Sequence, residues 1–174
     1  MTIRKQELTR RQLLSQSALF GASFLIGANY VAGKAEAANW ALEVEYLKPE
    51  TMATLIQMAR DIYPHDQVSD EFYAIAVKGY DTADAAPGIE AGVAALNDAA
   101  REIGFARYTD IGWERDRVTL LRSLEDTAFF QQIRGGLVTG LYNQKAVWPI
   151  FGYEGESYSK GGYIDRGFDD INWL

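Results

Sequence analysis

Apolar side chains recur every three or four positions along five stretches of this chain, the spacing of one face of an α-helix. The first stretch opens at Lys48-Pro49-Glu50 and stops at Pro64, because proline suits the first turn of a helix and ends its interior. The others run from residue 69 or 70 into the 81–86 region, from 87 to 104, from about 113 to 124, and from a capping Thr127 to Asn143. No stretch alternates apolar and polar residues for long enough to predict a sheet. The pattern predicts an all-α fold, a bundle of roughly five helices with an irregular C-terminal tail.

The same spacing predicts which side chains the helices bury. Beyond the first helix, the residues expected in the core include Phe72, Ile75, Ala76, Tyr80, Ile103 and Trp113. Gly135 and Gly136 interrupt the fifth helix, where each glycine costs about 1 kcal/mol relative to alanine. We interpret this pair as a point of close helix packing or a kink, in preference to contact with a partner's backbone.

The tail, residues 148–174, is rich in aromatic side chains and glycine. From Tyr153 onward a ring recurs every five positions, a step that fits neither a helix nor a strand. A disordered tail would be poor in rings, so these rings are expected to pack against something. We expect Trp148, Phe151 and Tyr153 to dock on the bundle and the later rings to face a partner. The candidate interface residues are Tyr153, Tyr158, Lys160, Tyr163, Arg166, Phe168 and Trp173.

Residues 1–37 hold the three parts of an export signal in the usual order. Arg10 and Arg11 precede Leu13 and Leu14, a mildly apolar run follows over residues 18–28, and Ala35-Glu36-Ala37 forms a small-residue site. The apolar run is shorter than the roughly 20 residues needed to span a bilayer. The paired arginines predict a twin-arginine signal that is cleaved after Ala37, so that Ala38 begins a single mature domain, 38–174. An amphipathic helix or an uncleaved membrane anchor is the alternative interpretation.

Composition narrows the chemistry. The chain has no cysteine and one histidine, His65, which excludes disulfides, thiolate metal sites and a multi-histidine metal site within it. Residues 38–174 hold 12 basic and 22 acidic side chains, and this acidic balance disfavours nucleic acid as a partner. The sequence also has no dinucleotide-binding glycine motif and no P-loop.

Several short strings carry a family resemblance. FGYEG at 151–155, KGGY at 160–163 and RGFDDINWL at 166–174 resemble the gluconate 2-dehydrogenase subunit 3 family, which contains the small (gamma) subunits of bacterial FAD-dependent sugar and polyol dehydrogenases. The likeness extends to the Y-P-x-D motif at 63–66, to Phe129-Phe130, to the L-Y-N segment at 141–143 and to Val147-Trp148.

The resemblance implies a non-catalytic subunit with no cofactor of its own. Such a subunit binds a glucose-methanol-choline (GMC) type dehydrogenase that carries FAD and lacks a signal, aids its maturation, and takes it through the twin-arginine translocon. A cytochrome c subunit with haem c commonly completes such complexes. The implied location is the periplasm, at the inner membrane through the complex. Arg10 and Arg11 would then carry the targeting and the tail the recognition.

Other chemistry remains open at two places. Tyr63, Pro64, His65 and Asp66 read as a structural corner at a helix end, although His65 beside Asp66 could also form an oriented base. The acidic pairs Glu154 with Glu156 and Asp169 with Asp170 read as solvated or ion-paired groups, although two carboxylates can also hydrolyse glycosides. The competing hypothesis is an independent periplasmic protein, either a carbohydrate-binding module or a small hydrolase.

Overall fold

The computed structural model describes residues 44–165, where the regular elements are all helical. Five α-helices occur in this range: α3 (Pro49–Ile62), α4 (Asp70–Lys78), α5 (Ala86–Glu102), α6 (Glu114–Ser123) and α7 (Ala128–Tyr142). Three short 3-10 helices accompany them: η1 (Tyr108–Asp110), η2 (Trp148–Phe151) and η3 (Tyr158–Lys160). The all-α prediction is confirmed for this part of the chain. Outside the described residues lie Arg10, Arg11, Leu13, Leu14, Ala35, Ala37, Ala38, Arg166, Phe168, Asp169, Asp170 and Trp173.

Four of the five helices begin and end within two residues of the predicted positions, whereas α4 ends at Lys78, before the 81–86 region expected from the sequence. Pro49 stands in the first turn of α3, and Pro64 lies just beyond its end. Thr127 caps α7, since its Oγ1 accepts a hydrogen bond of 3.2 Å from the N–H of Phe130. These ends fix the lengths of the helices that form the core.

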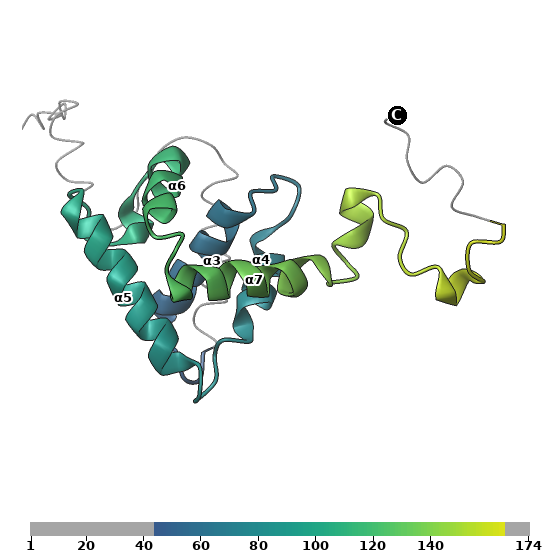
Figure 1. Ribbon diagram of the computed structural model, residues 1–174, viewed down its shortest axis with the longest axis horizontal. Coiled ribbons are helices and arrows are strands. Elements are labelled where there is room, and N and C mark those ends of the chain that lie inside the picture. The colour runs from purple at the N-terminus through teal and green to yellow at the C-terminus, as the bar shows by residue number, and fades with distance from the viewer. Residues whose placement is uncertain (1–43, 166–174) are drawn as a thin grey trace, which may run out of the picture.

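Helix α3 occupies the centre of the bundle. It contacts α4, α5, α6 and α7, and its buried side chains include Met52, Leu55 and Met58. Figure 1 shows α5 and α6 on one side of the molecule and α7 crossing its middle, while the chain beyond α7 continues away from the other helices. The bundle therefore forms one core around α3, and the segment after α7 lies at its periphery.

The predicted inner face of α4 is only partly right. The residues with the least exposure are Tyr73, Ala74 and Val77, whereas Ile75 is 46% exposed. Helix α4 packs between α3 and α7, so it buries two sides and leaves Ile75 on the third. Ile103 and Trp113, also expected in the core, lie beyond the ends of α5 and α6 and are largely exposed.

Close helix packing explains one of the paired glycines. A Cβ at Gly136 would overlap the hydroxyl of Tyr80, whereas a Cβ at Gly135 would meet open space. One turn later, a Cβ at Gly140 would lie 2.9 Å from the carbonyl oxygen of Ala76. Gly136 and Gly140 thus let α7 approach α4 closely, as expected of small residues at a helix crossing.

Residues 45–47, at the start of the described chain, are hydrogen-bonded to the loop after α4. The carboxylate of Asp81 accepts hydrogen bonds from three consecutive backbone N–H groups, those of Glu45 (2.9 Å), Tyr46 (2.8 Å) and Leu47 (2.9 Å), and from Lys78 (2.9 Å). Burial raises the pKa of Asp81, but these hydrogen bonds outweigh it and hold the pKa well below its usual range. The segment that enters the bundle is therefore fixed by an ionised side chain.

Candidate functional site

The corner after α3 is held together by side chains of α3 and α4. The hydroxyl of Tyr73 donates to the carbonyl of Tyr63 (2.6 Å) and accepts from the N–H of His65 (3.2 Å). Arg60 donates to the carbonyl of His65 (3.3 Å) and pairs with Asp70 (2.6 Å). These contacts satisfy backbone groups that the proline-terminated helix leaves free.

His65 links this corner to the end of α7. Its Nε2 lies 2.6 Å from the hydroxyl of Tyr142, and its ring lies edge-on to Phe151 with the centroids 4.8 Å apart. Tyr142 also packs edge-on against Tyr63, with the centroids 5.6 Å apart. Burial, and then the charge of Arg60, lower the pKa of His65 below its ordinary value. Tyr63, His65, Tyr142 and Phe151 form one aromatic cluster, called here the His65 joint.

The beginning of the tail is seated on this joint. The indole N–H of Trp148 donates to the carbonyl of Tyr142 (2.8 Å), so it satisfies one of the free carbonyls at the end of α7. Tyr153 returns to pack edge-on against Trp148, with the centroids 5.2 Å apart. Trp148 and Phe151 thus contact residues of the bundle, as expected, whereas the ring contact of Tyr153 is with Trp148, and both Phe151 and Tyr153 remain substantially exposed.

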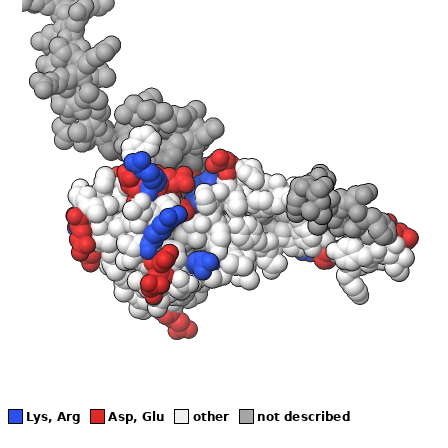
Figure 2. Space-filling model, turned by 45° about the horizontal axis from the view of Figure 1, so that its top comes forward, with Lys and Arg blue, Asp and Glu red and all other residues white. Residues whose placement is uncertain are grey.

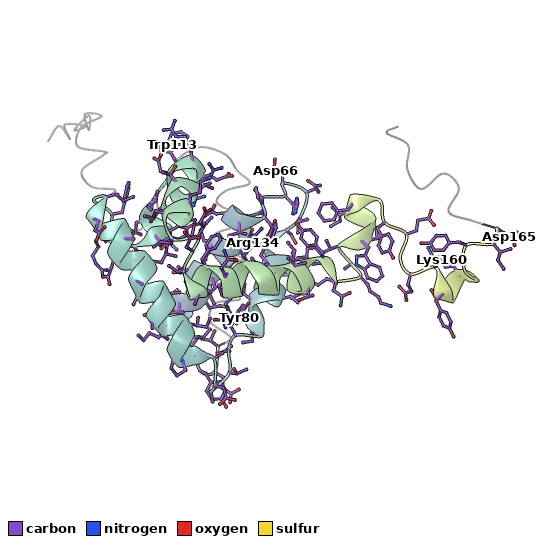
Figure 3. The ribbon with its side chains drawn as sticks, in the orientation of Figure 1. Asp66, Tyr80, Trp113, Arg134, Lys160 and Asp165 are labelled. Atoms are coloured by element: carbon purple, nitrogen blue, oxygen red, sulfur yellow. The ribbon has the colours of Figure 1, made fainter. Side chains whose placement is uncertain are left out.

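Residues 152–165, called here the arm, extend away from the bundle (Figure 1). The side chain of Tyr158 is 93% exposed, and Tyr163 and Ile164 are also exposed, at 59% and 83%. Figure 3 places Lys160 and Asp165 on this arm, far from Trp113 at the other end of the molecule. Most candidate interface residues that the structure describes are thus presented to solvent on the projecting arm.

Three charged side chains of the arm, those of Glu154, Glu156 and Lys160, form ion pairs close to their own positions in the chain. Lys145, in the turn after α7, pairs with Glu156 (3.0 Å), and Lys160 pairs with Glu154 (3.5 Å) while donating to the carbonyl of the same residue. The backbone N–H of Glu156 and the Lys145 ammonium lower the pKa of Glu156. Lys160, expected to face a partner, is in this structure part of the arm's own framework.

The geometry favours local roles for the groups weighed as catalytic. His65 turns its Nε2 toward Tyr142, while Asp66 is exposed and the turn is closed instead by the Val68 N–H, which donates to the carbonyl of His65 (3.1 Å). Glu154 and Glu156 are engaged by different lysines. The partner that the structure gives the His65 imidazole is thus a tyrosine hydroxyl, and each of the two glutamates has a lysine as its partner.

A buried polar cluster that sequence reasoning missed lies in the bundle. The carboxylate of Asp61 on α3 accepts from Arg117 Nε (2.7 Å) and Nη2 (2.9 Å) on α6, and from the Tyr108 hydroxyl (2.5 Å) on η1. Arg117 also donates to the carbonyl of Ile111 (2.9 Å). Burial, followed by the charge of Asp61, raises the pKa of Tyr108. Each of the three is almost inaccessible to solvent, so the cluster acts as a structural tie between α3, η1 and α6.

Two features are absent from residues 44–165. Within that range, no three His, Asp or Glu side chains gather closely enough to hold a metal ion. No helix there is both long enough and apolar enough to cross a membrane. Comparisons with models of protein families, with curated proteins and with solved structures find no significant match to this chain.

Proposed function

We propose that this chain is a non-catalytic small subunit that escorts a partner FAD-dependent, GMC-type sugar or polyol dehydrogenase. It binds the partner before export, aids its maturation, carries it through the twin-arginine translocon and remains bound in the periplasm. FAD belongs to the partner, and haem c to a cytochrome c subunit where one completes the complex. The support from sequence is the twin-arginine pattern at Arg10 and Arg11, together with the tail strings that resemble the gluconate 2-dehydrogenase subunit 3 family.

One structural observation carries the proposal furthest: the arm projects from the bundle with Tyr158, Tyr163 and Ile164 exposed to solvent. Aromatic side chains are favoured anchors of protein interfaces, and their exposure in water costs free energy that a partner would recover. A segment seated on one side of a folded bundle and free on the other is suited to holding a second protein. The local pairing of His65, Glu154 and Glu156 supports a structural use of these groups.

Export provides the direct test. The double variant Arg10→Lys with Arg11→Lys is expected to leave both this chain and its flavoprotein in the cytoplasm, as measured by immunoblotting of periplasmic and cytoplasmic fractions and by periplasmic dehydrogenase activity. Arg4→Lys is the matched control, because it changes a basic residue of the same segment outside the pair. A flavoprotein that still reached the periplasm with the double variant would refute the escort hypothesis.

Assembly provides the second test. A chain without residues 159–174 is expected to keep its helical circular dichroism, because the hydrogen bonds and the ion pair given for residues 159–165 lie within the arm. It is expected to lose co-purification with the dehydrogenase. Full binding by the shortened chain would place the interface on the bundle instead.

The exposed ring of Tyr158 also keeps carbohydrate binding as the alternative, because an exposed aromatic face can stack on a sugar. Calorimetry of the purified chain with glucose, fructose, gluconate and sorbitol separates the two hypotheses. An escort subunit is expected to be inert toward these compounds until the flavoprotein is added.

A further inference from the structure

Turns and hydrogen bonds within the chain itself set the conformation of the arm before any partner binds. Gly155 has a φ of +95°, and a Cβ there would sit 3.4 Å from the Trp148 ring, so the chain turns closely over that ring. Further along, the N–H of Gly162 donates to the carbonyl of Ser157 (2.8 Å), and Gly161 adopts a left-handed φ of +85°. This turn encloses η3 and presents Tyr158 outward. A prearranged segment loses little conformational freedom on binding.

The paired charges determine what the arm can recognise. The ammonium groups of Lys145 and Lys160 already lie against Glu156 and Glu154, so the arm has no cluster of unmatched positive charge in its described part. Figure 2 shows the acidic and basic side chains gathered over the bundle, while the projecting end is mostly uncharged surface with acidic atoms near its tip. This charge pattern does not favour an anionic lipid surface. It leaves the uncharged rings as the recognition elements.

We propose that the arm binds its protein partner by inserting the Tyr158 ring into an uncharged, apolar pocket, with Tyr163 and Ile164 covering the pocket's rim. The inference rests on the proposed function, which supplies the flavoprotein as the partner. A nearly fully exposed tyrosine on a prearranged turn has the features of an interface anchor, since a large ring gains apolar burial and its hydroxyl keeps one polar contact. Charge contributes little to this binding, so salt has little effect on it.

The test is the affinity of the purified full-length chain for the partner that the proposed function names, a GMC-type dehydrogenase of the same organism that carries FAD and lacks its own signal. Tyr158→Ser is expected to raise the Kd by at least about tenfold, the usual effect of losing an aromatic side chain that anchors an interface. Trp113→Ser is the matched control, because that ring is 75% exposed at the opposite end of the molecule. The control is expected to change the Kd by less than about threefold, since an exposed side chain away from the interface contributes little.

Charge is tested separately from the ring. Lys145→Gln with Glu156→Gln removes one ion pair while keeping polar side chains of similar length, and the Kd is expected to stay within about threefold. Raising NaCl from about 0.1 to about 1 M, which shortens the Debye length from roughly 10 to roughly 3 Å, is expected to change the Kd by a similarly small factor.

The outcomes separate this inference from the proposed function. If the wild-type chain binds and Tyr158→Ser binds equally well, or if salt abolishes binding, the pocket inference is wrong while the escort function stands. If the wild-type chain does not bind the dehydrogenase, both are wrong. Two other results would also overturn the inference, because they would assign the Tyr158 ring to another surface. One is self-association of the chain, and the other is sedimentation with phosphatidylglycerol vesicles. Either would have to depend on Tyr158 and persist when the dehydrogenase is present.

Discussion

The imidazole Nε2 of His65 lies 2.6 Å from the hydroxyl of Tyr142, although 77 positions separate the two residues in sequence. His65 belongs to the corner between α3 and α4, and Tyr142 is the last residue of α7. Phe151 closes over the same imidazole. One side chain therefore connects the corner of the bundle to the base of the arm.

The first prediction concerns pH. The pKa of His65 is lowered in the folded state by burial and by Arg60, so the unfolded chain binds a proton at a higher pH than the folded chain. The contribution of neutral His65 to the stability of the fold is therefore complete above its ordinary pKa of 6.5, and it declines as the pH falls below that value. We expect the Tm, measured by circular dichroism, to fall as the pH decreases from about 7 to about 5, and to fall less in His65→Gln.

Between about pH 7 and about pH 5, the effect of His65 on the Tm can be separated from the effects of the other titrating groups. His65 is the only histidine in the chain, and its charged neighbour Arg60 is paired with Asp70. The lowered pKa values of Asp81 and Glu90 start from ordinary values of 3.8 and 4.5, so their effects begin at lower pH. Equal pH dependence in the wild type and the variant would contradict the prediction.

The second prediction concerns the buried ion pair. Arg117→Met leaves the carboxylate of Asp61 buried without its guanidinium and is expected to lower the free energy of unfolding by about 3–5 kcal/mol. Arg115→Met, on the exposed side of the same helix, is expected to change it by less than about 0.5 kcal/mol. Urea unfolding followed by circular dichroism measures both. Similar values for the two variants would show that the tie between α3 and α6 contributes little.

The third prediction compares two glycines of α7. Gly135→Ala is expected to stabilise the protein by about 0.5–1 kcal/mol, because a Cβ there meets open space and alanine favours the helix. Gly140→Ala is expected to destabilise it by about 1–3 kcal/mol, because the new Cβ would press on the backbone of Ala76. Thermal unfolding of the two single variants measures both changes in stability. If both substitutions raised the Tm, or both lowered it, the close approach of α4 and α7 would be contradicted.

The fourth prediction concerns the start of the described chain. Asp81→Ala removes the acceptor of the backbone N–H groups of Glu45, Tyr46 and Leu47, and is expected to cost about 2 kcal/mol. Hydrogen exchange followed by mass spectrometry is expected to show faster exchange in the peptide that covers those residues. Asp84→Ala, in the same loop but exposed, serves as the control. Unchanged exchange at 45–47 in Asp81→Ala would show that other contacts hold this segment.

Part of the site could be predicted from the sequence. The turn at Tyr63-Pro64 follows from proline chemistry, and the exposure of Tyr158 agrees with a ring spacing that no regular element can bury. The role of Tyr142 could not be predicted, since its partner is 77 positions away and only the packing of α7 brings the two together. Lys160 was expected to face a partner, but whether a lysine pairs with Glu154 or points outward depends on a backbone turn that its residue type does not specify.

The sequence by itself determined the five helices and their ends, except the end of α4, because 3.6-residue periodicity, proline and a threonine cap act within one or two turns. Tertiary structure decided which faces were buried. Helix α4 covers two sides because it lies between α3 and α7, so Ile75 is exposed although its spacing matches a core position. It also decided that Asp61 and Arg117 meet in the interior, 56 positions apart, since long-range pairing depends on how the helices pack and leaves no local pattern in the chain.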